Sequence, residues 1–330
     1  MVARVGVVVI GRNEGERLRR CLQSLDPMAR PTVYVDSGST DTSVAVAGSL
    51  GADVVPLDLT TQFTAARARN AGFDRLLALA PGIEYVQFVD GDSEVDPRWL
   101  DAAVAALDGR PEVVVACGRR RERHPDLSIY NRLCDLEWDV PIGPAISCGG
   151  DALMRVPAFR AVGGYRADLI AGEEPELCVR LRAAGGSVMM VDALMTRHDA
   201  AMTRFGQWWK RNVRAGHAFA EVARLHRRNP FGIWRREVRS NWAWGLALPF
   251  LALGLWPITW GLSPLLFGGY FVLFLKIYRG RRQWGNDPLT ARRYAFFCVM
   301  SKMPQALGQV LFWRNRLLGR RGRLIEYKGP

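Results

Sequence analysis

The 330-residue chain has no C-x-x-C pair and no histidine at zinc-finger spacing. Its six cysteines are scattered along the sequence, which argues against a zinc site and indicates reduced, mostly buried thiols of a cytosolic domain. The N-terminus has a short apolar run at residues 5–10, without the length or the small-residue cleavage site of a signal peptide. We therefore expect the first domain to stay in the cytoplasm.

Acidic residues are scarce in the last part of the chain. Residues 201–330 contain 4 Asp and Glu against 23 Lys and Arg, whereas residues 1–200 contain 28 against 22. Nearly all of these basic residues are arginine, which suits both phosphates and lipid headgroups. The basic residues flank apolar segments and do not interleave with a recognition motif, so we expect no nucleic-acid partner. The sequence thus predicts a mildly acidic domain followed by a strongly basic region.

Strand and helix patterns alternate at the start of the chain. Apolar periodicity predicts strands at residues 5–10, 32–35, 54–57 and 85–89, with helices at 14–25, 42–50 and 63–80. This alternation predicts β-α-β units and a mainly parallel sheet flanked by helices. Ligands bind outside the carboxyl ends of such strands, so the loops at 11–14, 36–41 and 90–94 are the candidate site.

Two carboxylates, Asp90 and Asp92, follow the fourth predicted strand. A divalent cation such as Mg²⁺ takes oxygen ligands and joins carboxylates of this kind to the phosphates of a nucleotide. An ordinary acidic turn has the same appearance. The pattern favours a metal-dependent enzyme that acts on a diphosphate, with the solvated turn as the alternative.

The loop at 36–41 and the helix at 63–80 offer further ligands for a nucleotide. Asp36 can accept a hydrogen bond from a base or a ribose, and the small residues around it allow close approach. Alternatively, Ser39 or Asp41 simply caps the helix that follows. Arg67 and Arg69 can reach a diphosphate, or lie solvated on the helix surface.

Six stretches of the sequence, taken in order, resemble the family 2 glycosyltransferases. They are VVVIGRNEGERLRRCLQSL (7–25), YVDSGSTDTS (34–43), ARARNAGF (66–73), QFVDGDSEVDPRWL (87–100), SCGGDALMRVPAFRAVGGYRADL (147–169) and GEEPELCVRLRAAG (172–185). The resemblance implies a Rossmann-like GT-A fold and an enzyme that passes a sugar from a nucleotide diphosphate to a hydroxyl acceptor with inversion.

The resemblance also implies roles for single residues. The metal, Mg²⁺ or Mn²⁺, is expected on Asp90 and Asp92, with His198 as a further ligand in the manner of some relatives; a lone histidine is otherwise structural. The residues expected to contact the nucleotide are Asn13, Glu14, Asp36, Ser37, Arg67, Arg69 and Asp90. Ser37 stands where the family often has a second Asp, which leaves the identity of the base open.

Glu174 stands at the position of the family's catalytic base. An inverting transfer needs one carboxylate to take the proton of the acceptor hydroxyl. The family usually has Asp there, and Glu is one methylene longer. Glu173 and Asp168 are the reserve candidates. Alternatively, the acidic residues only stabilise the N-terminus of a helix.

The resemblance extends loosely to residues that contact the acceptor or the diphosphate. Asp151 is expected to hold a sugar hydroxyl or to form an Asx turn. The segment at 207–214 is similar to a Gln/Arg/Trp motif of processive members, although the residue order differs. An interfacial amphipathic helix is the alternative that we favour for it. The residues concerned are Gln207, Trp208, Arg211 and Arg214.

Residues 242–275 contain no charged side chain and are bordered by arginines. This length exceeds one upright span, and a turn at 261–264 predicts a transmembrane hairpin, with a single kinked span as the alternative. Residues 294–313 predict an interfacial or re-entrant helix. We therefore expect a catalytic domain at 1–226 and a membrane-associated region at 227–330.

The two regions together predict an enzyme at the cytoplasmic face of the inner (plasma) membrane. Its partners would be a nucleotide-sugar donor, membrane lipids and a lipid-linked or growing glycan acceptor, as in polysaccharide biosynthesis of the cell envelope. Ser37 and Glu174 depart from the family pattern and keep one rival interpretation open. In that interpretation the domain is a degenerate nucleotide-sugar-binding membrane scaffold.

Overall fold

The computed structural model describes residues 4–320, 322 and 325, which form two compact units. The α/β unit contains residues 4–203 and 229–231, and the helical unit contains residues 204–228 and those from 232 onward. The helical unit starts ahead of the predicted boundary at 226/227, because α8 (Phe205–Leu225) packs along α13 (Lys302–Leu317). Gln305 on α13 donates a hydrogen bond to Asn212 on α8 at 2.9 Å.

The strands of the α/β unit form one sheet, whose described part has nine strands in the order β3-β2-β1-β4-β8-β6-β9-β5, with β7 paired to β9. Their bounds are β1 Val5–Gly11, β2 Thr32–Asp36, β3 Asp53–Pro56, β4 Tyr85–Asp90, β5 Ser93–Val95, β6 Val113–Glu122, β7 Gly143–Ala145, β8 Ala152–Arg155 and β9 Ser187–His198. The four strands predicted from the sequence correspond to β1 to β4, and their mutual pairing is parallel.

The sheet is mixed, which corrects the prediction of a mainly parallel one. β8 runs antiparallel to both β4 and β6, and β9 runs antiparallel to β5 and β7. β6 and β9 pair in parallel. The prediction failed beyond residue 100 because the pairing of β8 between β4 and β6 joins segments far apart in the sequence, and local periodicity carries no information about it.

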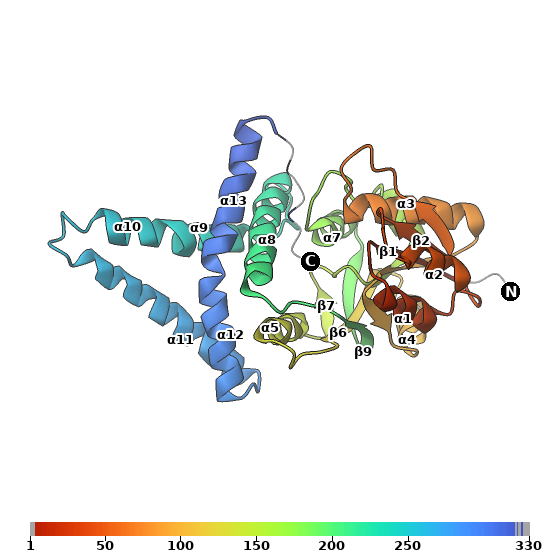
Figure 1. The fold of residues 1–330 in the computed structure, drawn as a ribbon, viewed down its shortest axis with the longest axis horizontal. Helices are drawn as coiled ribbons and strands as arrows, with labels where there is room; N and C mark the ends of the chain where they lie inside the picture. The colour runs from red at the N-terminus through yellow and green to blue at the C-terminus, as the bar shows by residue number, and fades with distance from the viewer. Residues whose placement is uncertain (1–3, 321, 323–324, 326–330) are drawn as a thin grey trace. The chain divides into compact units, whose positions relative to one another are not determined.

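Helices flank the sheet (Figure 1). Their bounds are α1 Glu16–Leu25, α2 Ser43–Ser49, α3 Ala65–Leu79, α4 Trp99–Asp108, α5 Ile129–Trp138, α6 Val156–Ala161 and α7 Glu173–Ala183. α1 to α3 lie where the sequence predicted helices. α3 packs closely on β1 and β2, because Gly72 faces the sheet: a Cβ there would lie 2.4 Å from Cγ1 of Val8.

An aromatic cluster fills the core behind the carboxyl-terminal half of β4. The rings of Phe73, Phe88, Phe159 and Tyr165 pack edge to face or tilted, with centroids 4.6–6.5 Å apart. Phe88, Phe159 and Tyr165 are almost fully buried. Such pairs stabilise a core beyond the area they bury. The cluster gives the residues at the end of β4 a rigid base.

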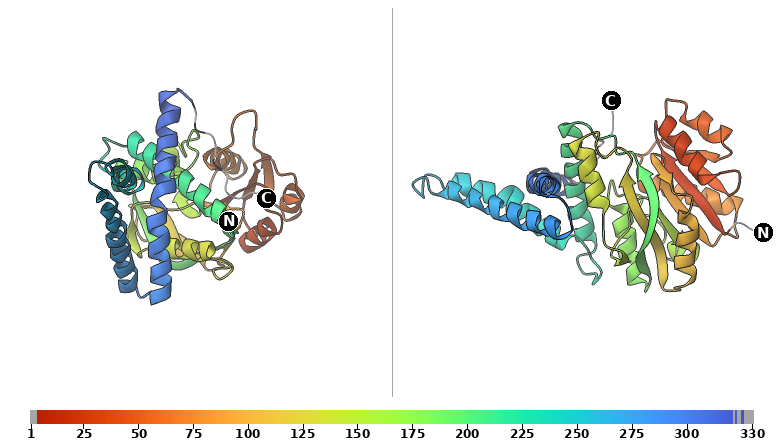
Figure 2. Two further views of the ribbon diagram at one scale, coloured as in Figure 1. Left: turned by 60° about the vertical axis from the view of Figure 1, so that its left-hand side comes forward. Right: turned by 90° about the horizontal axis from the view of Figure 1, so that it is seen from below.

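The helical unit consists of helices joined by short turns (Figure 2). Besides α8 and α13 it contains α9 Arg235–Trp242, a π-helical turn at Ala243–Ala247, α10 Leu248–Gly254, a 3₁₀ turn at Ser263–Phe267, α11 Gly268–Gln283 and α12 Pro288–Met300. The predicted helical pair in residues 242–275 is present. However, none of the helices in the part of the chain that the structure describes combines the length and the hydrophobicity needed to cross a membrane, so the predicted transmembrane crossings are not supported.

A single interfacial or re-entrant helix was predicted for residues 294–313, and this prediction is wrong. These residues are divided between α12 and α13, with Ser301 between the two helices.

Candidate active site

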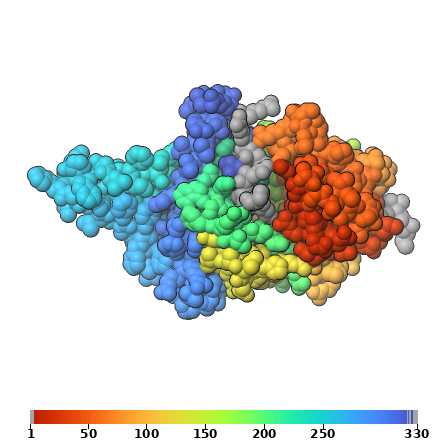
Figure 3. Space-filling view, in the orientation of Figure 1, coloured from red at the N-terminus to blue at the C-terminus, as the bar shows by residue number. Residues whose placement is uncertain are grey.

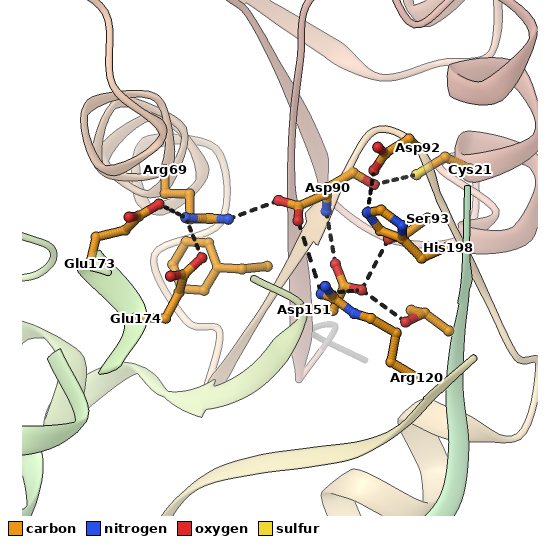
Figure 4. Close-up of polar contacts among 12 residues, drawn as sticks. Cys21, Arg69, Asp90, Asp92, Ser93, Arg120, Asp151, Glu173, Glu174 and His198 are labelled. Carbon is orange, nitrogen blue, oxygen red and sulfur yellow. Dashed lines mark hydrogen bonds and ion pairs between the residues drawn. The ribbon is translucent and has the colours of Figure 1, made fainter. Parts of the chain in front are cut away.

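The two carboxylates that follow β4 lie beside a histidine from β9. Asp90 is the last residue of β4, and the antiparallel pairing of Ser93 with His198 brings the end of β9 to the same edge of the sheet. His198 Nε2 lies 3.3 Å from Asp92 Oδ1 (Figure 4). One ligand atom from each of Asp90, Asp92 and His198 lies within 4.8 Å of the others. The structure therefore brings together the three predicted metal ligands.

The chemistry of these donors fits a divalent cation. Carboxylate oxygens suit Mg²⁺ and Mn²⁺, and an added imidazole favours a transition ion such as Mn²⁺ over Mg²⁺. Asp92 and His198 are buried, whereas the side chain of Asp90 is 26% exposed. Asp90 is thus the most accessible of the three candidate ligands.

Arg69 joins the end of β4 to the start of α7. Its side chain is 2% exposed, and its guanidinium donates to Asp90 at 2.8 Å and to Glu173 at 2.9 Å. The distance from Arg69 Nη1 to Glu174 Oε1 is 3.1 Å. Arg69 therefore contacts three carboxylates, and its predicted role as a ligand of the nucleotide stays a prediction.

The charges around Asp90 decide its protonation state. Burial raises the pKa of Asp90, but the guanidinium groups of Arg69 and Arg120 outweigh it and hold the pKa below the ordinary value. Arg120 comes from β6 and lies 4.0 Å from Asp90 and 2.8 Å from Asp151. Asp90 is thus ionised at neutral pH, as a metal ligand must be.

Asp151 is fully buried beneath the site, and its predicted contact with a sugar hydroxyl stays a prediction. It accepts hydrogen bonds from the Asp90 backbone N–H at 2.9 Å, Ser93 Oγ at 3.0 Å and Thr196 Oγ1 at 2.8 Å. Burial raises the pKa of Asp151, against the lowering effect of Arg120. These bonds join the residue before β8 to β4, β5 and β9, the strands that carry or adjoin the predicted metal ligands.

Position 150 requires glycine, because the side chains of Asp90 and Arg69 lie against its backbone. A Cβ at Gly150 would lie 2.5 Å from Asp90 Oδ2 and 2.7 Å from Arg69 Nη2. Any side chain there would displace the carboxylate at the end of β4.

The predicted base Glu174 lies in the first turn of α7, next to the buried Glu173. Its side chain is 15% exposed. Burial, followed by repulsion from Glu173, raises the pKa of Glu174 to about 7 against the opposing effect of Arg69. A carboxylate with such a pKa can accept a proton near neutral pH. The reserve candidate Asp168 is exposed and paired with Arg166.

The predicted nucleoside loop is held by hydrogen bonds to Asp36. This buried carboxylate accepts from the Gly38 and Ser39 backbone N–H groups at 3.0 and 2.9 Å, and from Tyr34 Oη at 3.0 Å. Asn13 Oδ1 accepts from the Thr40 N–H at 2.7 Å, which links the loop at 11–14 to this one.

Three other predicted ligands of the nucleotide lie in or near these loops. Glu14 pairs with Arg17 at 2.9 Å, and Ser37 is buried. Arg67 donates to the carbonyls of residues 58, 61 and 62, at 2.9, 3.1 and 3.0 Å, and so orders the segment that precedes α3. Asp41 Oδ1 accepts from the Ser43 N–H at 2.9 Å, but Thr42 occupies the N-cap position of α2, and no side chain that the structure describes caps this helix.

The predicted motif at 207–214 belongs to the helical unit. Gln207 Oε1 accepts from the Arg204 N–H at the start of α8, and Trp208 is buried against Phe297 at a ring distance of 5.2 Å. Arg211 and Arg214 lie on the same helix. Contacts of these four residues with an acceptor or a diphosphate stay predictions.

Two residues of the site escaped the sequence analysis. Arg120 is one of three consecutive arginines in β6, and Trp138 ends α5 with its ring 4.9 Å from that of His198. The Arg120 guanidinium lies 5.4 Å from the Trp138 ring. The sequence could have indicated Arg120, because successive side chains of a strand point to opposite faces of the sheet. The middle one of three consecutive arginines therefore points to the face opposite its two neighbours.

Comparisons with known proteins identify a family over part of the chain. Residues 6–159 match the family model "Glycosyl transferase family 2". The chain is 27% identical over 208 residues to the succinoglycan biosynthesis protein ExoA of Rhizobium meliloti, which covers 56% of this chain and 60% of that protein. It is 28% identical over 242 residues to the pre-mycofactocin glycosyltransferase of Mycobacterium tuberculosis. This match covers 67% of this chain and 48% of that protein.

Solved structures show the same fold. The mannosyltransferase PcManGT from Pyrobaculum calidifontis, solved in complex with GDP-Man and Mn²⁺, superimposes with a TM-score of 0.60 at 19% identity, over 92% of this chain and 87% of that one. The S. aureus TarS 1-349 structure gives a TM-score of 0.53 at 14% identity, over 96% of this chain and 92% of that one.

Over residues 6–159 the chain therefore matches glycosyltransferase family 2, and its α/β unit has a GT-A-like fold. It spans from about a third to three fifths of the length of the curated relatives that it matches.

Proposed function

We propose that the protein is a metal-dependent, inverting glycosyltransferase that moves a sugar from a nucleotide-diphosphate sugar to a hydroxyl acceptor. The observation that carries this proposal is the arrangement of Asp90, Asp92 and His198 at the carboxyl end of β4, connected through Arg69 to Glu174. The family match supports the donor class, and the names of the relatives support glycosyl transfer.

The donor would bind at the loops that follow β1, β2 and β4. Asp36 and Asn13 order the two loops nearest the nucleoside, and the family resemblance assigns Asp36 to the nucleoside itself. Asp90, Asp92 and His198 would hold Mn²⁺ or Mg²⁺ against the diphosphate. When bound, such an ion neutralises the negative charge that develops on the leaving group.

Glu174 would act as the general base. A single displacement at the anomeric carbon requires that the acceptor hydroxyl lose its proton as its oxygen attacks opposite the leaving phosphate. The raised pKa of Glu174, about 7, makes this carboxylate a stronger proton acceptor than an ordinary glutamate. Arg69 would keep the carboxylate in place, because its guanidinium is itself fixed between Asp90 and Glu173.

We further propose a lipid-linked or growing glycan acceptor at the cytoplasmic face of the plasma membrane. The basic composition of residues 201–330 and the uncharged segment at 242–275 support this location. The name of the relative from Rhizobium meliloti supports a role in polysaccharide biosynthesis.

Turnover of nucleotide sugars tests the proposal. The full chain would be incubated with UDP- and GDP-sugars and Mn²⁺, and release of the nucleoside diphosphate would be measured for the wild type and for Glu174→Gln. We expect turnover that falls about 100-fold or more in the variant, as for loss of a general base. Glu112→Gln, at an exposed glutamate of the same unit, is the matched control and should leave the rate unchanged.

Two outcomes would overturn the proposal. Equal turnover by Glu174→Gln and the wild type would remove Glu174 from its role as base. A folded wild type that binds a nucleotide sugar but turns over none of them would favour the scaffold interpretation.

A further inference from the structure

The uncharged segment of the helical unit forms a helical hairpin, defined here as residues 242–275. Its first arm runs from the end of α9 through α10, and its second arm is the start of α11. Ser263 Oγ donates to the Ala252 carbonyl at 2.6 Å, and Tyr270 Oη donates to the Trp244 carbonyl. Within the helical unit, α10 and α11 meet at a turn that projects away from α12 and α13 (Figures 1 and 3).

Large apolar side chains cover the projecting end of the hairpin. Trp260 is 95% exposed, and Ile258 and Leu265 are about three quarters exposed. Further side chains at least half exposed are Phe250, Leu251, Leu253, Trp256, Leu262, Phe271 and Val272. Many exposed apolar side chains gathered on one segment of a folded protein mark a site of interaction with a partner or a membrane.

Four backbone N–H groups of the turn at the end of the hairpin are paired within it. The backbone N–H groups of Ile258, Thr259, Gly261 and Leu262 donate to carbonyls within the turn at 2.9–3.1 Å. The Thr259 hydroxyl donates to the Leu255 carbonyl at 2.9 Å. Hydrocarbon cannot hydrogen-bond to a peptide group, so backbone exposed to lipid must be paired internally. A water-exposed turn has no such requirement.

Positive charge borders both arms at the end opposite the turn. Arg235, Arg236 and Arg239 precede the hairpin, and Lys276, Arg279, Arg281 and Arg282 follow it. Basic residues next to an apolar segment attract the anionic lipids of a cytoplasmic leaflet. The charge of this region complements an anionic membrane surface and disfavours a second copy of the same unit, which would bring like charges together.

We propose that the hairpin inserts into an anionic phospholipid bilayer, with residues 250–272 among the acyl chains and the bordering arginines at the headgroups. The helical stretch from residue 242 to 254 is about 20 Å long, and the uncharged start of α11 about 12 Å, at 1.5 Å per residue. Both are shorter than the hydrocarbon core of about 30 Å. The hairpin therefore enters from one side and returns to it.

This proposal rests on the membrane location proposed above and deepens it. Binding to vesicles tests it without sugar transfer, so its failure would leave the proposed glycosyl transfer untouched. The full chain would be floated with vesicles of phosphatidylcholine and phosphatidylglycerol, and with vesicles of phosphatidylcholine alone. We expect stronger binding to the anionic vesicles. Ile258→Asp and Leu265→Asp should each weaken it by about tenfold or more, because a charge replaces an apolar side chain that would lie among the acyl chains.

Leu317→Asp is the matched control, since Leu317 is 83% exposed, lies outside the hairpin and undergoes the same change of charge. It should float like the wild type, and nucleotide binding should be equal in all variants. Equal flotation of the control and the hairpin variants would overturn the proposal. So would hairpin variants that change the oligomeric state and not the flotation, because the apolar surface would then bind a second copy.

Discussion

The proposed base makes a quantitative prediction about pH. The pKa of Glu174 rises from 4.5 to about 7, a change of about 3 kcal/mol in favour of the protonated form. Only the ionised carboxylate can take a proton from the acceptor, so activity is low below this pKa and rises through it. Between about pH 6 and about pH 8 the ionised fraction, and with it kcat/KM, should increase about tenfold.

Glu173→Gln separates this explanation from a general effect of pH. The substitution removes the negative charge of Glu173, which is the second largest cause of the raised pKa of Glu174, the largest being burial. It also removes one of the three carboxylates that contact Arg69, so that only Asp90 and Glu174 remain as its partners. The rising limb of the profile should therefore move to lower pH. The assay is release of nucleoside diphosphate from the donor as a function of pH. A limb that stays in place, or moves to higher pH, would refute the reasoning.

Three further predictions concern the surroundings of the site. Arg69→Met removes a positive charge from Glu174, so the rising limb of the same pH profile should move to higher pH. Asp151→Ala leaves Arg120 buried without its closest carboxylate and should lower the free energy of unfolding by about 3–5 kcal/mol, as measured by urea denaturation. Gly72→Ala places a methyl group against β1 and should cost about 1–3 kcal/mol in the same measurement.

The first half of the fold was predictable because it consists of local units. β1 to β4 and α1 to α3 follow from short periodic runs, and the connection rules for β-α-β units fix their order. The grouping of Asp90 and Asp92 followed from their place at a strand end. Only the family resemblance placed His198 beside these residues. It lies there because β5 pairs with β9, and the sequence does not reveal a pairing between segments about 100 residues apart.

The roles of charged residues inside the site were less predictable. Arg69 and Asp151 were assigned to the diphosphate and the acceptor, yet the structure pairs them with other residues of the protein. A sequence shows which charges exist but not which of them are buried together. Burial strongly favours internal pairing of charges, since an unpaired charge in the interior is costly. The hairpin at 242–275 shows the same limit, since composition indicated its hydrophobicity but not the length of its arms.

Metal-dependent nucleotide binding is the most direct test of the central claim. Binding of UDP and GDP to the full chain would be measured by calorimetry with Mn²⁺, and again after EDTA, for the wild type and Asp92→Ala. Asp101→Ala, at an exposed carboxylate on α4, is the control. We expect binding that requires the metal, is lost in Asp92→Ala and is retained in the control. Binding by folded Asp92→Ala as tight as that of the wild type, or no nucleotide binding by the wild type, would contradict it.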